Sequence, residues 1–286
     1  MDNHTPVLLE EVLHFLNPQS GGRFIDATAG AGGHAAAILE RTAPDGALLV
    51  VDQDDSALEL SRRNLAPYKA RTTFVQANFA DIDHVAREED FLGADGLVAD
   101  LGVSSMMLDD PQRGFSFRLD GPLDMRMDRR GELTAAEIVN YTSEKELANL
   151  IYTLGEERRS RPLARSIVRA RPHHTTADLV QAIEAVTGKP RYGRIHPATR
   201  TFMALRLAVN KELDSIRTLL EASGKILHAG GRLVIISFHS LEDRIVKHRM
   251  RELGKVLTKK VVRAGRQELD RNPRARSAKL RAMEIV

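Results

Sequence analysis

Short apolar runs alternate with helix-like segments over the first hundred residues. Four such runs predict strands at 24–26, 47–51, 72–76 and 97–99. The second run is apolar throughout, which is typical of a strand buried on both faces. Apolar residues at helical spacing predict helices at 7–16, 35–39 and 56–65. Strands that alternate with helices predict a mostly parallel sheet with right-handed crossovers, and therefore an α/β fold.

The alternation stops at Gly102, and the next hundred residues are helical. A loop rich in Gly, Asp and Arg spans 109–131. The helices predicted after it are 134–140, 143–154, 161–171 and 176–186. Three of these helices are preceded by capping-type pairs, namely Thr134 with Glu137, Ser143 with Glu146, and Thr175 with Asp178.

The sheet pattern resumes near the C-terminus. His196 and Pro197 precede a long helix that reaches about residue 211, and a second helix ends near 228–231. The apolar run 233–236 then predicts another buried strand. We therefore expect a sheet domain made of 1–103 and 210–286, and an inserted helical domain made of 104–209.

A glycine-rich turn joins the first strand to the next helix. Its glycines, Gly30, Gly32 and Gly33, permit a sharp turn and a close approach of a ligand to the backbone. The N-terminus of the helix behind them offers N–H groups that have no partner within the helix. This arrangement predicts a nucleoside cofactor site, although a glycine turn without a ligand is the simpler alternative.

The glycines alone do not identify the nucleoside. With Ala35 in the third position they also satisfy a dinucleotide fingerprint, and Asp52 lies where a ribose-binding acid is expected. Asp26, at the end of the strand before the turn, favours a different ligand. A carboxylate at this position suits the cationic S-adenosylmethionine, whereas it would repel a pyrophosphate. The sequence therefore favours S-adenosylmethionine over NAD.

Polar or aromatic residues follow each predicted strand at its carboxyl end, where ligands bind in parallel sheets. The residues are Asp26, Asp52, the pair Asn78 and Phe79, Asp100, and the pair Phe238 and His239. We expect Asp52 to bind ribose hydroxyls, Phe79 to lie against adenine, and Asp100 to face the reacting methyl group. A single acid after a strand is more often a helix cap, so the hypothesis depends on their convergence.

Composition narrows the chemistry further. The chain has no Cys, which excludes disulfides and thiolate metal sites, and we assign no residue to a metal. Methylation of a pyrimidine at C5 generally uses a Cys nucleophile, so a methylase of this composition is expected to attack a heteroatom. The sequence has no run of 18 apolar residues and no signal-like N-terminus. We therefore expect a cytoplasmic protein with no membrane contact.

Charge is distributed unevenly although the net charge is only +3. Residues 1–103 and 210–243 carry 11 Lys and Arg against 22 Asp and Glu, whereas residues 244–286 carry 14 against 4. A basic C-terminal segment on an acidic body favours a polyanionic partner, although a merely solvated end is the alternative. The insertion adds a cluster of arginines at 158, 159, 161, 165, 169 and 171. Its interpretation is open between a basic face and a helix surface crossed by ion pairs.

Several strings of residues closely resemble the MraW (RsmH) methyltransferase family over nearly the whole chain. They are the N-terminal His4-Thr-Pro-Val-Leu-Leu9, Gly32-Gly33-His34, Asp100-Leu-Gly-Val-Ser-Ser105, Arg113-Gly-Phe-Ser-Phe117, Asp120-Gly-Pro-Leu-Asp-Met-Arg-Met-Asp128, Gly155-Glu-Glu-Arg158, His196-Pro-Ala-Thr-Arg-Thr-Phe202, Ile236-Ser-Phe-His-Ser-Leu-Glu-Asp-Arg244 and Asn272-Pro-Arg-Ala-Arg-Ser277. The resemblance implies a Rossmann-like class I methyltransferase fold with an inserted helical domain. It further implies S-adenosylmethionine-dependent methylation of N4 of a cytidine in the decoding centre of 16S rRNA.

The resemblance also assigns residues to the cofactor. Its contacts are Gly32, Gly33, His34, Asp52, Phe79 and Asp100. One further position, Met107, stands where family members commonly have a Gln beside the cofactor. Methionine is flexible and of similar length, so a hydrogen bond is lost at this position but the activity is not excluded.

Three residues are candidates for the reaction itself. Asp100 is expected to accept a hydrogen bond or a proton from the target amine, and Phe238 to stack on an extruded base. His239 lies on the same rim and is an alternative proton acceptor. Two other functions stay open, an RNA-binding ribosome-assembly factor with a vestigial cofactor pocket and a nicotinamide-dependent oxidoreductase. The sequence also leaves open whether the chain forms a homodimer.

Overall fold

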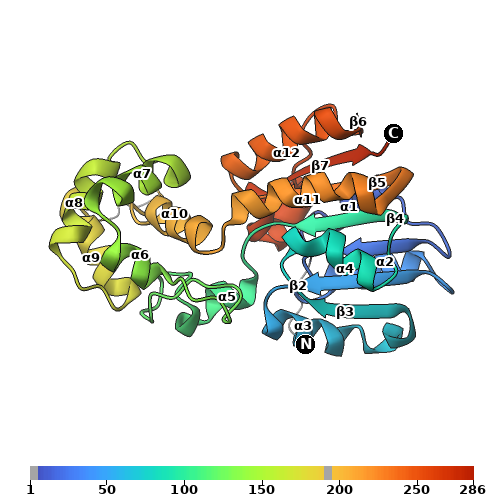
Figure 1. The fold of residues 1–286 in the computed structure, drawn as a ribbon, viewed down its shortest axis with the longest axis horizontal. Coiled ribbons are helices and arrows are strands. Elements are labelled where there is room, and N and C mark those ends of the chain that lie inside the picture. The colour runs from blue at the N-terminus through green and yellow to red at the C-terminus, as the bar shows by residue number, and fades with distance from the viewer. Residues whose placement is uncertain (1–5, 190–194) are drawn as a thin grey trace. The chain divides into compact units, whose positions relative to one another are not determined.

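The computed structural model describes residues 6–189 and 195–286, and the chain divides into two compact units (Figure 1). The sheet unit comprises Met1–Gly102 and Leu213–Val286, and the helical unit comprises Val103–Glu212. These boundaries differ by one and three residues from the expected ones at 103/104 and 209/210. His4 and Thr5, which begin the N-terminal string, lie outside the described residues.

A seven-stranded sheet forms the centre of the sheet unit. Its strands are β1 (Arg23–Asp26), β2 (Ala47–Asp52), β3 (Thr72–Gln76), β4 (Ala94–Asp100), β5 (Leu227–Ser237), β6 (Lys255–Val256) and β7 (Lys279–Glu284). The strand order is β3-β2-β1-β4-β5-β7-β6. The first five strands in this order pair in parallel, and β7 pairs antiparallel with both β5 and β6. The predicted α/β fold with a mostly parallel sheet is confirmed.

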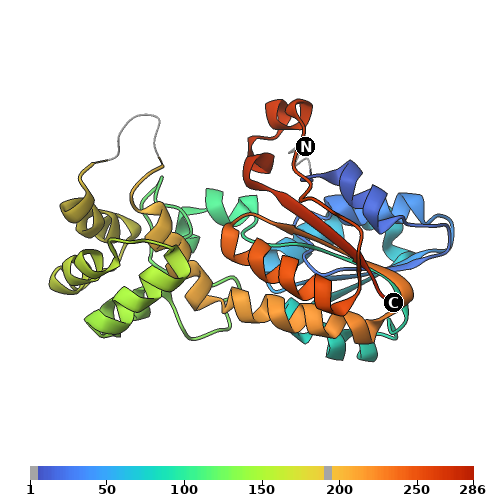
Figure 2. The same cartoon turned by 90° about the horizontal axis from the view of Figure 1, so that it is seen from above.

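Helices cover both faces of this sheet. Side chains along a strand alternate between the two faces, so strands that are apolar throughout give each face an apolar surface against which helices pack. Ile25, Leu49 and Val51 pack in one apolar cluster, and their neighbours Phe24 and Leu48 pack in the other. The first cluster is completed by α4 (Ile82–Glu88), α11 (Glu212–Ile226) and α12 (Ser240–Leu253), and the second by α1 (Leu9–Leu16), α2 (Gly33–Arg41) and α3 (Asp55–Asn64) (Figure 2). Shorter helical turns are η1 (Ala66–Arg71), η2 (Phe79–Asp81), α13 (Arg266–Arg271) and η4 (Pro273–Ser277).

Strand β5 begins at Leu227, so the prediction of helix up to 228–231 is wrong there. Gly230 has φ of +90°, a conformation that L side chains rarely adopt. A Cβ on Gly231 would lie 2.9 Å from the carbonyl oxygen of His228 and 3.1 Å from that of Ala94. The glycines therefore let an irregular first part of β5 run close beside β4, and the register between the two strands shifts there.

Residues 244–286, which we interpreted from their charge as a basic C-terminal segment, contain a strand of the sheet. Strand β7 comes from this segment, and three of its apolar residues, Leu280, Ala282 and Met283, are completely buried. Sequence analysis missed β7 because its half-buried charged residues, Lys279 and Arg281, gave the segment the composition of a charged end. The C-terminal segment thus completes the sheet, and only part of it forms an exposed basic surface.

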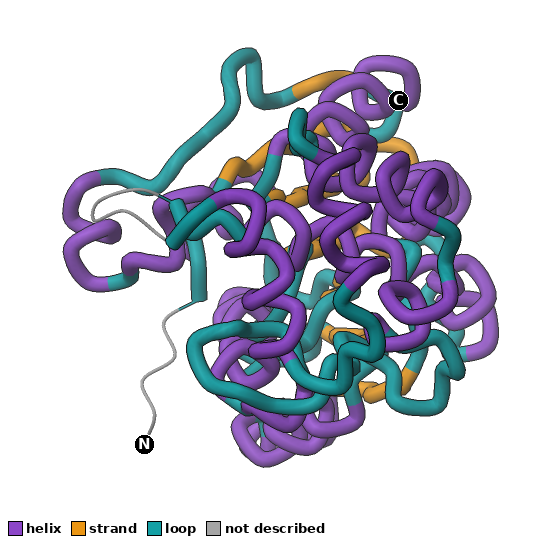
Figure 3. Tube along the Cα trace, turned by 90° about the vertical axis from the view of Figure 1, so that its left-hand side faces the viewer, coloured by secondary structure: helices purple, strands orange, loops and turns teal. Residues whose placement is uncertain are grey.

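The helical unit packs its helices around a core of its own. Its helices are α5 (Ser105–Asp109), α6 (Ala135–Tyr141), α7 (Glu144–Gly155), α8 (Ser160–Arg169), α9 (Thr176–Thr187) and α10 (Thr199–Val209), with the 3-10 turn η3 (Pro111–Arg113). The three predicted capping pairs are confirmed, because each forms reciprocal hydrogen bonds at the start of α6, α7 or α9. Figure 3 distinguishes helices from strands along the trace, and every named strand belongs to the sheet unit. None of the helices in 6–189 and 195–286 has the length and apolar content needed to cross a membrane.

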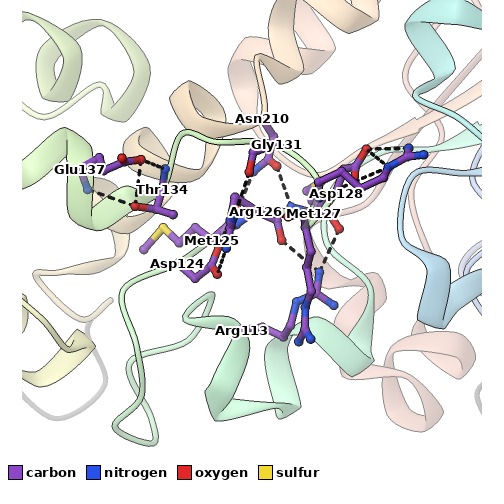
Figure 4. A network of polar contacts seen from close by, with 12 residues as sticks. Arg113, Asp124, Met125, Arg126, Met127, Asp128, Gly131, Thr134, Glu137 and Asn210 are labelled. Carbon is purple, nitrogen blue, oxygen red and sulfur yellow. Dashed lines mark hydrogen bonds and ion pairs between the residues drawn. The ribbon is translucent and has the colours of Figure 1, made fainter.

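The expected loop at 109–131 is ordered by polar contacts within the helical unit (Figure 4). The guanidinium of Arg113 donates to the carbonyl oxygens of Arg126 and Met127, each at 3.0 Å. Asn210, at the end of α10, accepts from the Met127 amide at 2.8 Å and donates to the Met125 carbonyl at 2.8 Å. These bonds explain how a segment without strands or long helices is fixed.

Candidate functional site

The glycine turn after β1 leaves room for a ligand. Gly30 and Gly32 have φ of +49° and +82°. At Gly32 a Cβ would lie 3.2 Å from the Ser61 hydroxyl oxygen, so the turn packs tightly against α3 on that side. At Gly30 the nearest atom to such a Cβ would be the Thr28 carbonyl oxygen, at 4.0 Å. The turn is therefore tightly packed on one side and open on the other, which is the shape of a cradle for a nucleoside.

Asp52, at the end of β2, is tied to this turn. Its Oδ2 accepts a hydrogen bond from the Gly30 amide at 3.0 Å, and its Oδ1 accepts from the Asp54 amide at 2.9 Å. Burial raises the pKa of Asp52 to about 6, against the effect of these hydrogen bonds. The carboxylate is thus fixed at the edge of the cradle, with lone pairs left for ribose hydroxyls.

Asp26 and Asp100 end the neighbouring strands β1 and β4. Each has a buried carboxylate oxygen, Oδ2 of Asp26 and Oδ1 of Asp100, with no hydrogen-bond partner among the described residues. Burial is the main cause that raises the pKa of Asp26 to about 7, and the charge of Asp52 adds to it. Burial, then the charges of Asp26 and Glu242, raises the pKa of Asp100 well above its ordinary value. Such a cluster favours a cationic ligand or a proton.

Asn78 and Phe79 follow β3. Asn78 accepts from the Ala80 amide at 2.8 Å and donates to the Gln53 side chain at 2.9 Å, which fixes the turn. Phe79 is half-buried and packs at the edge of the apolar cluster that contains Ile82. An aromatic ring is thus held at the strand end next to that of Asp52, in the position expected for a contact with adenine.

His34 lies in the first turn of α2, where the sequence predicts a cofactor contact. The residue is buried, and Nε2 of its ring lies 2.9 Å from the carbonyl oxygen of Val7. The imidazole therefore joins α2 to the segment that leads into α1. This structural use of the side chain was not anticipated, because spacing along a helix does not show what lies beneath its first turn.

Phe238 and His239 follow β5, next to the exit of β4. Asp100 is in register with Ile236, and the Leu101 amide donates to the Ile236 carbonyl oxygen at 2.9 Å. A Cβ added to Gly102 would lie 3.5 Å from the Phe238 ring. The structure therefore places Phe238 beside the segment that follows Asp100, as the order of the strands predicts.

Glu242, in the first turn of α12, is a site residue that sequence analysis missed. It is completely buried, and its Oε2 accepts from the amides of Phe238 at 2.8 Å and His239 at 3.3 Å. Its Oε1 lies 3.0 Å from Nε2 of His239, close enough for an ion pair but without the alignment of a hydrogen bond. The signal was present as the spacing His239-x-x-Glu242, which forms a capping box with a histidine in place of Ser or Thr.

Met107 belongs to the other unit. Its side chain is buried, and it packs in the core of the helical unit with Phe115, Met125 and Leu205. The Ser104 hydroxyl accepts from the Met107 amide at 3.2 Å and caps α5. The seven other acidic, aromatic and imidazole candidates, Asp26, His34, Asp52, Phe79, Asp100, Phe238 and His239, all lie in the sheet unit.

The arginine cluster of the helical unit divides into two kinds. Arg159 donates to the carbonyl oxygen of Val186, and Arg171 donates to those of Val139 and Thr142. These two arginines therefore join helices. The others include three exposed residues spaced one helical turn apart along α8, Arg161, Arg165 and Arg169, which we call the α8 stripe. Arg165 contacts the carboxylate of Glu144 at 3.4 Å, and among the described residues it is the only member of the α8 stripe with such a contact.

A second basic surface lies between α12 and β7. Its exposed residues are Lys259, Lys260, Arg263 and Arg266, and we call them the C-terminal basic set. Within residues 6–189 and 195–286, no carboxylate lies within ion-pair distance of these four side chains. In the described part of the chain no group of three or more His, Cys, Asp and Glu is placed to hold a metal ion.

Comparison with known proteins gives a consistent result. A family model described as the MraW methylase family matches residues 1–286. The Ribosomal RNA small subunit methyltransferase H of Acidobacterium capsulatum is 51% identical over 292 residues, which cover 99% of this chain and 98% of the relative. The protein of the same name from Nostoc sp. is 53% identical, and the match covers 99% of this chain and 92% of that relative. The one from Desulfotalea psychrophila is 50% identical, and the match covers 99% of this chain and 98% of that relative. The chain is a member of the MraW methylase family.

Proposed function

We propose that this chain transfers a methyl group from S-adenosylmethionine to N4 of a cytidine in the decoding centre of the 16S rRNA. The methylase family and the relatives named as small-subunit rRNA methyltransferases give the reaction class and the substrate. The Rossmann-like sheet with an antiparallel β7 is the class I methyltransferase fold, which uses S-adenosylmethionine. The observation that carries the proposal is the convergence of Asp26, Asp52 and Asp100 around the glycine cradle.

The residues of the sheet unit fit this cofactor. The buried Oδ2 of Asp26 has no hydrogen-bond partner among the described residues, and it suits the amino-acid end of a cation. Asp52 would hold the ribose hydroxyls, and Phe79 would lie against the adenine. Gly32, Gly33 and His34 would contribute backbone groups from the turn and the first turn of α2, since the imidazole of His34 is used elsewhere.

Bound S-adenosylmethionine supplies an activated methyl group, and the chain's residues supply position and proton transfer. The N4 lone pair of cytosine is delocalised into the ring, so an acceptor for the N4 protons would make the nitrogen a better nucleophile. Asp100 would accept such a proton, because its buried Oδ1 has no partner among the described residues. Phe238 would stack on the extruded base, and His239 is the second proton acceptor on the rim.

The RNA would be bound by the two basic surfaces, the α8 stripe and the C-terminal basic set. Exposed arginines and lysines bind phosphates and release counterions, which gives most of the sequence-independent affinity of RNA-binding proteins. Residues 104–209 would thus act as the substrate-recognition domain. A substrate in the small ribosomal subunit supports a cytoplasmic location, which is part of this proposal. Met107 lies in the core of the helical unit, so we propose a packing role for its side chain.

Ligand binding separates this function from the oxidoreductase alternative. S-adenosylmethionine should raise the unfolding temperature of the purified protein, because a ligand that binds only the folded state stabilises it. NAD should leave the temperature unchanged, since its pyrophosphate would face the carboxylate of Asp26. A shift with NAD alone would contradict the proposal. An RNA-binding factor with a vestigial pocket would show no shift with either ligand.

A further inference from the structure

The side chain of Glu242 is buried, although a helix cap does not require burial. A capping box on the surface of a protein uses an exposed Glu, as Glu137 and Glu146 do at the starts of α6 and α7. Glu242 makes the same reciprocal bonds but is completely buried. Burial of a carboxylate costs free energy unless the charge is used or compensated. One ion-pair contact of Glu242 is with His239, a residue of the same rim.

The contacts of Glu242 fix both residues that follow β5. One oxygen, Oε2, accepts from the amides of Phe238 and His239, so it determines the direction in which the chain leaves the sheet. The Glu242 amide donates to Nδ1 of His239 at 3.4 Å, which leaves the proton of a neutral imidazole on Nε2, the nitrogen that lies 3.0 Å from Oε1. The Phe238 ring in turn lies beside Gly102, two residues after Asp100.

The charge of Glu242 also acts on Asp100. Two carboxylates raise the pKa of Asp100 beyond the effect of burial, Asp26 from β1 and Glu242 from α12. Neither is recorded in a hydrogen bond with Asp100, and the Asp100 amide is bonded to the Thr28 hydroxyl. Glu242 therefore acts on the pKa of Asp100 through its charge, whereas it acts on Phe238 and His239 through hydrogen bonds to their amides.

We propose that Glu242 is a positioning residue for the methyl transfer, which holds Phe238 and His239 on the rim where β4 and β5 end. Its consequence for the reaction rests on the function proposed above, while its hydrogen bonds and its charge concern the protein alone. Glutamine and alanine separate the two effects. Glu242→Gln keeps an oxygen for the two amides but removes the charge, whereas Glu242→Ala removes both.

The first experiment titrates the unliganded protein, with its Asp carboxyl carbons labelled with carbon-13, by NMR. The Asp100 signal is assigned by its loss in Asp100→Asn. The pKa of Asp100 should fall by about half a unit to two units in Glu242→Gln, the range for removing a nearby like charge. Asp243→Asn is the matched control, because Asp243 is the next residue of α12 and pairs with Arg281 at 2.7 Å. An Asp100 pKa that stays unchanged in Glu242→Gln overturns the electrostatic role, whatever the substrate is.

The second experiment measures single-turnover methylation of small ribosomal subunits at saturating S-adenosylmethionine. Glu242→Ala should lower the rate at least tenfold, and Glu242→Gln should recover most of it at high pH. In Glu242→Gln the pH at which the rate is half-maximal should also fall, in step with the Asp100 pKa. If Glu242→Gln has the wild-type rate and an unshifted half-maximal pH, Glu242 acts only as a helix cap. This comparison does not need Glu242→Ala, so it can be made even if that variant does not fold. Failure of the wild-type protein to methylate cytidine N4 would instead contradict the proposed function.

Discussion

The amide of Asp100 donates a hydrogen bond of 2.7 Å to the hydroxyl oxygen of Thr28. This bond joins the carboxyl end of β4 to the turn that follows β1, where the Thr28 amide in turn donates to Oδ1 of Asp26 at 3.1 Å. Two acids that are 74 positions apart in the chain are thereby held at one edge of the sheet. Their shared environment leads to the first prediction.

Asp26 should make the unliganded protein less stable as pH rises. Its pKa is about 7 in the folded chain and 3.8 as an ordinary value, so between these values the folded state holds a proton that the unfolded state has lost. The free energy of unfolding should therefore fall as pH rises from about 4 to 7. Asp26→Asn removes this part of the pH dependence, roughly 1 to 4 kcal/mol.

Urea unfolding at pH 5 and pH 8 measures this effect. The difference in the free energy of unfolding between the two pH values should be smaller in Asp26→Asn than in the wild type. The exposed Asp45, in the turn before β2, provides the control variant Asp45→Asn, for which we expect the wild-type difference. Equal differences for all three proteins would show that Asp26 ionises normally in the folded chain.

Asp52→Asn should weaken S-adenosylmethionine binding without unfolding the sheet. The variant keeps one oxygen for the Gly30 or Asp54 amide but loses acceptor capacity for ribose hydroxyls. We expect a loss of about 1 to 3 kcal/mol, or roughly fivefold to 150-fold in affinity. Isothermal titration calorimetry measures it, with Asp45→Asn as the control. An unchanged affinity in a folded Asp52→Asn protein would place the ribose elsewhere.

Asp100→Asn should slow the methyl transfer itself. An amide cannot take up a proton from the N4 amine, and a positioned acid or base contributes about 10² to 10⁴ in rate. Because Asp100 also lies beside the proposed cofactor site, single-turnover rates are compared at saturating S-adenosylmethionine. Weak binding combined with a normal saturated rate would make Asp100 a binding residue only, and His239 would then be the acceptor to test.

The two basic surfaces should contribute to RNA binding and leave S-adenosylmethionine binding unchanged. The C-terminal variant replaces Lys259, Lys260, Arg263 and Arg266 by Gln, the helical variant replaces Arg161, Arg165 and Arg169, and the control replaces the exposed Arg62 and Arg63 of α3. Each lost phosphate contact should lower the slope of log affinity against log salt by about 1. Slopes equal to that of the wild type would mean that the surface concerned is only solvated.

The sequence predicts the parallel part of the sheet well because buried parallel strands form continuous apolar runs. Its failures have equally local causes. Strand β7 alternates the half-buried Lys279 and Arg281 with the buried Leu280 and Ala282, so its average composition resembles a charged tail. The first part of β5 depends on Gly230 and Gly231, which by composition indicate the end of a helix.

In the candidate site, too, features that depend on neighbouring residues could be predicted, and features that depend on residues distant in the chain could not. The position of each acid at a strand end follows from the strand pattern, so Asp26, Asp52 and Asp100 could be named from the sequence. Three features of the site depend on residues distant in the chain. They are the contact of the His34 imidazole with Val7, the packing of Met107 with Phe115, and the burial of Glu242. Spacing alone does not contain this information.

The identity of the methylated atom can be measured directly. The purified protein is incubated with radiolabelled S-adenosylmethionine and small ribosomal subunits that lack the modification, and the RNA is then digested to nucleosides and separated by chromatography. We expect the label in N4-methylcytidine from the decoding centre, and Asp100→Asn should lose most of it. Label in another nucleoside, or no transfer by the folded wild-type protein, would show that this chain does not methylate cytidine N4.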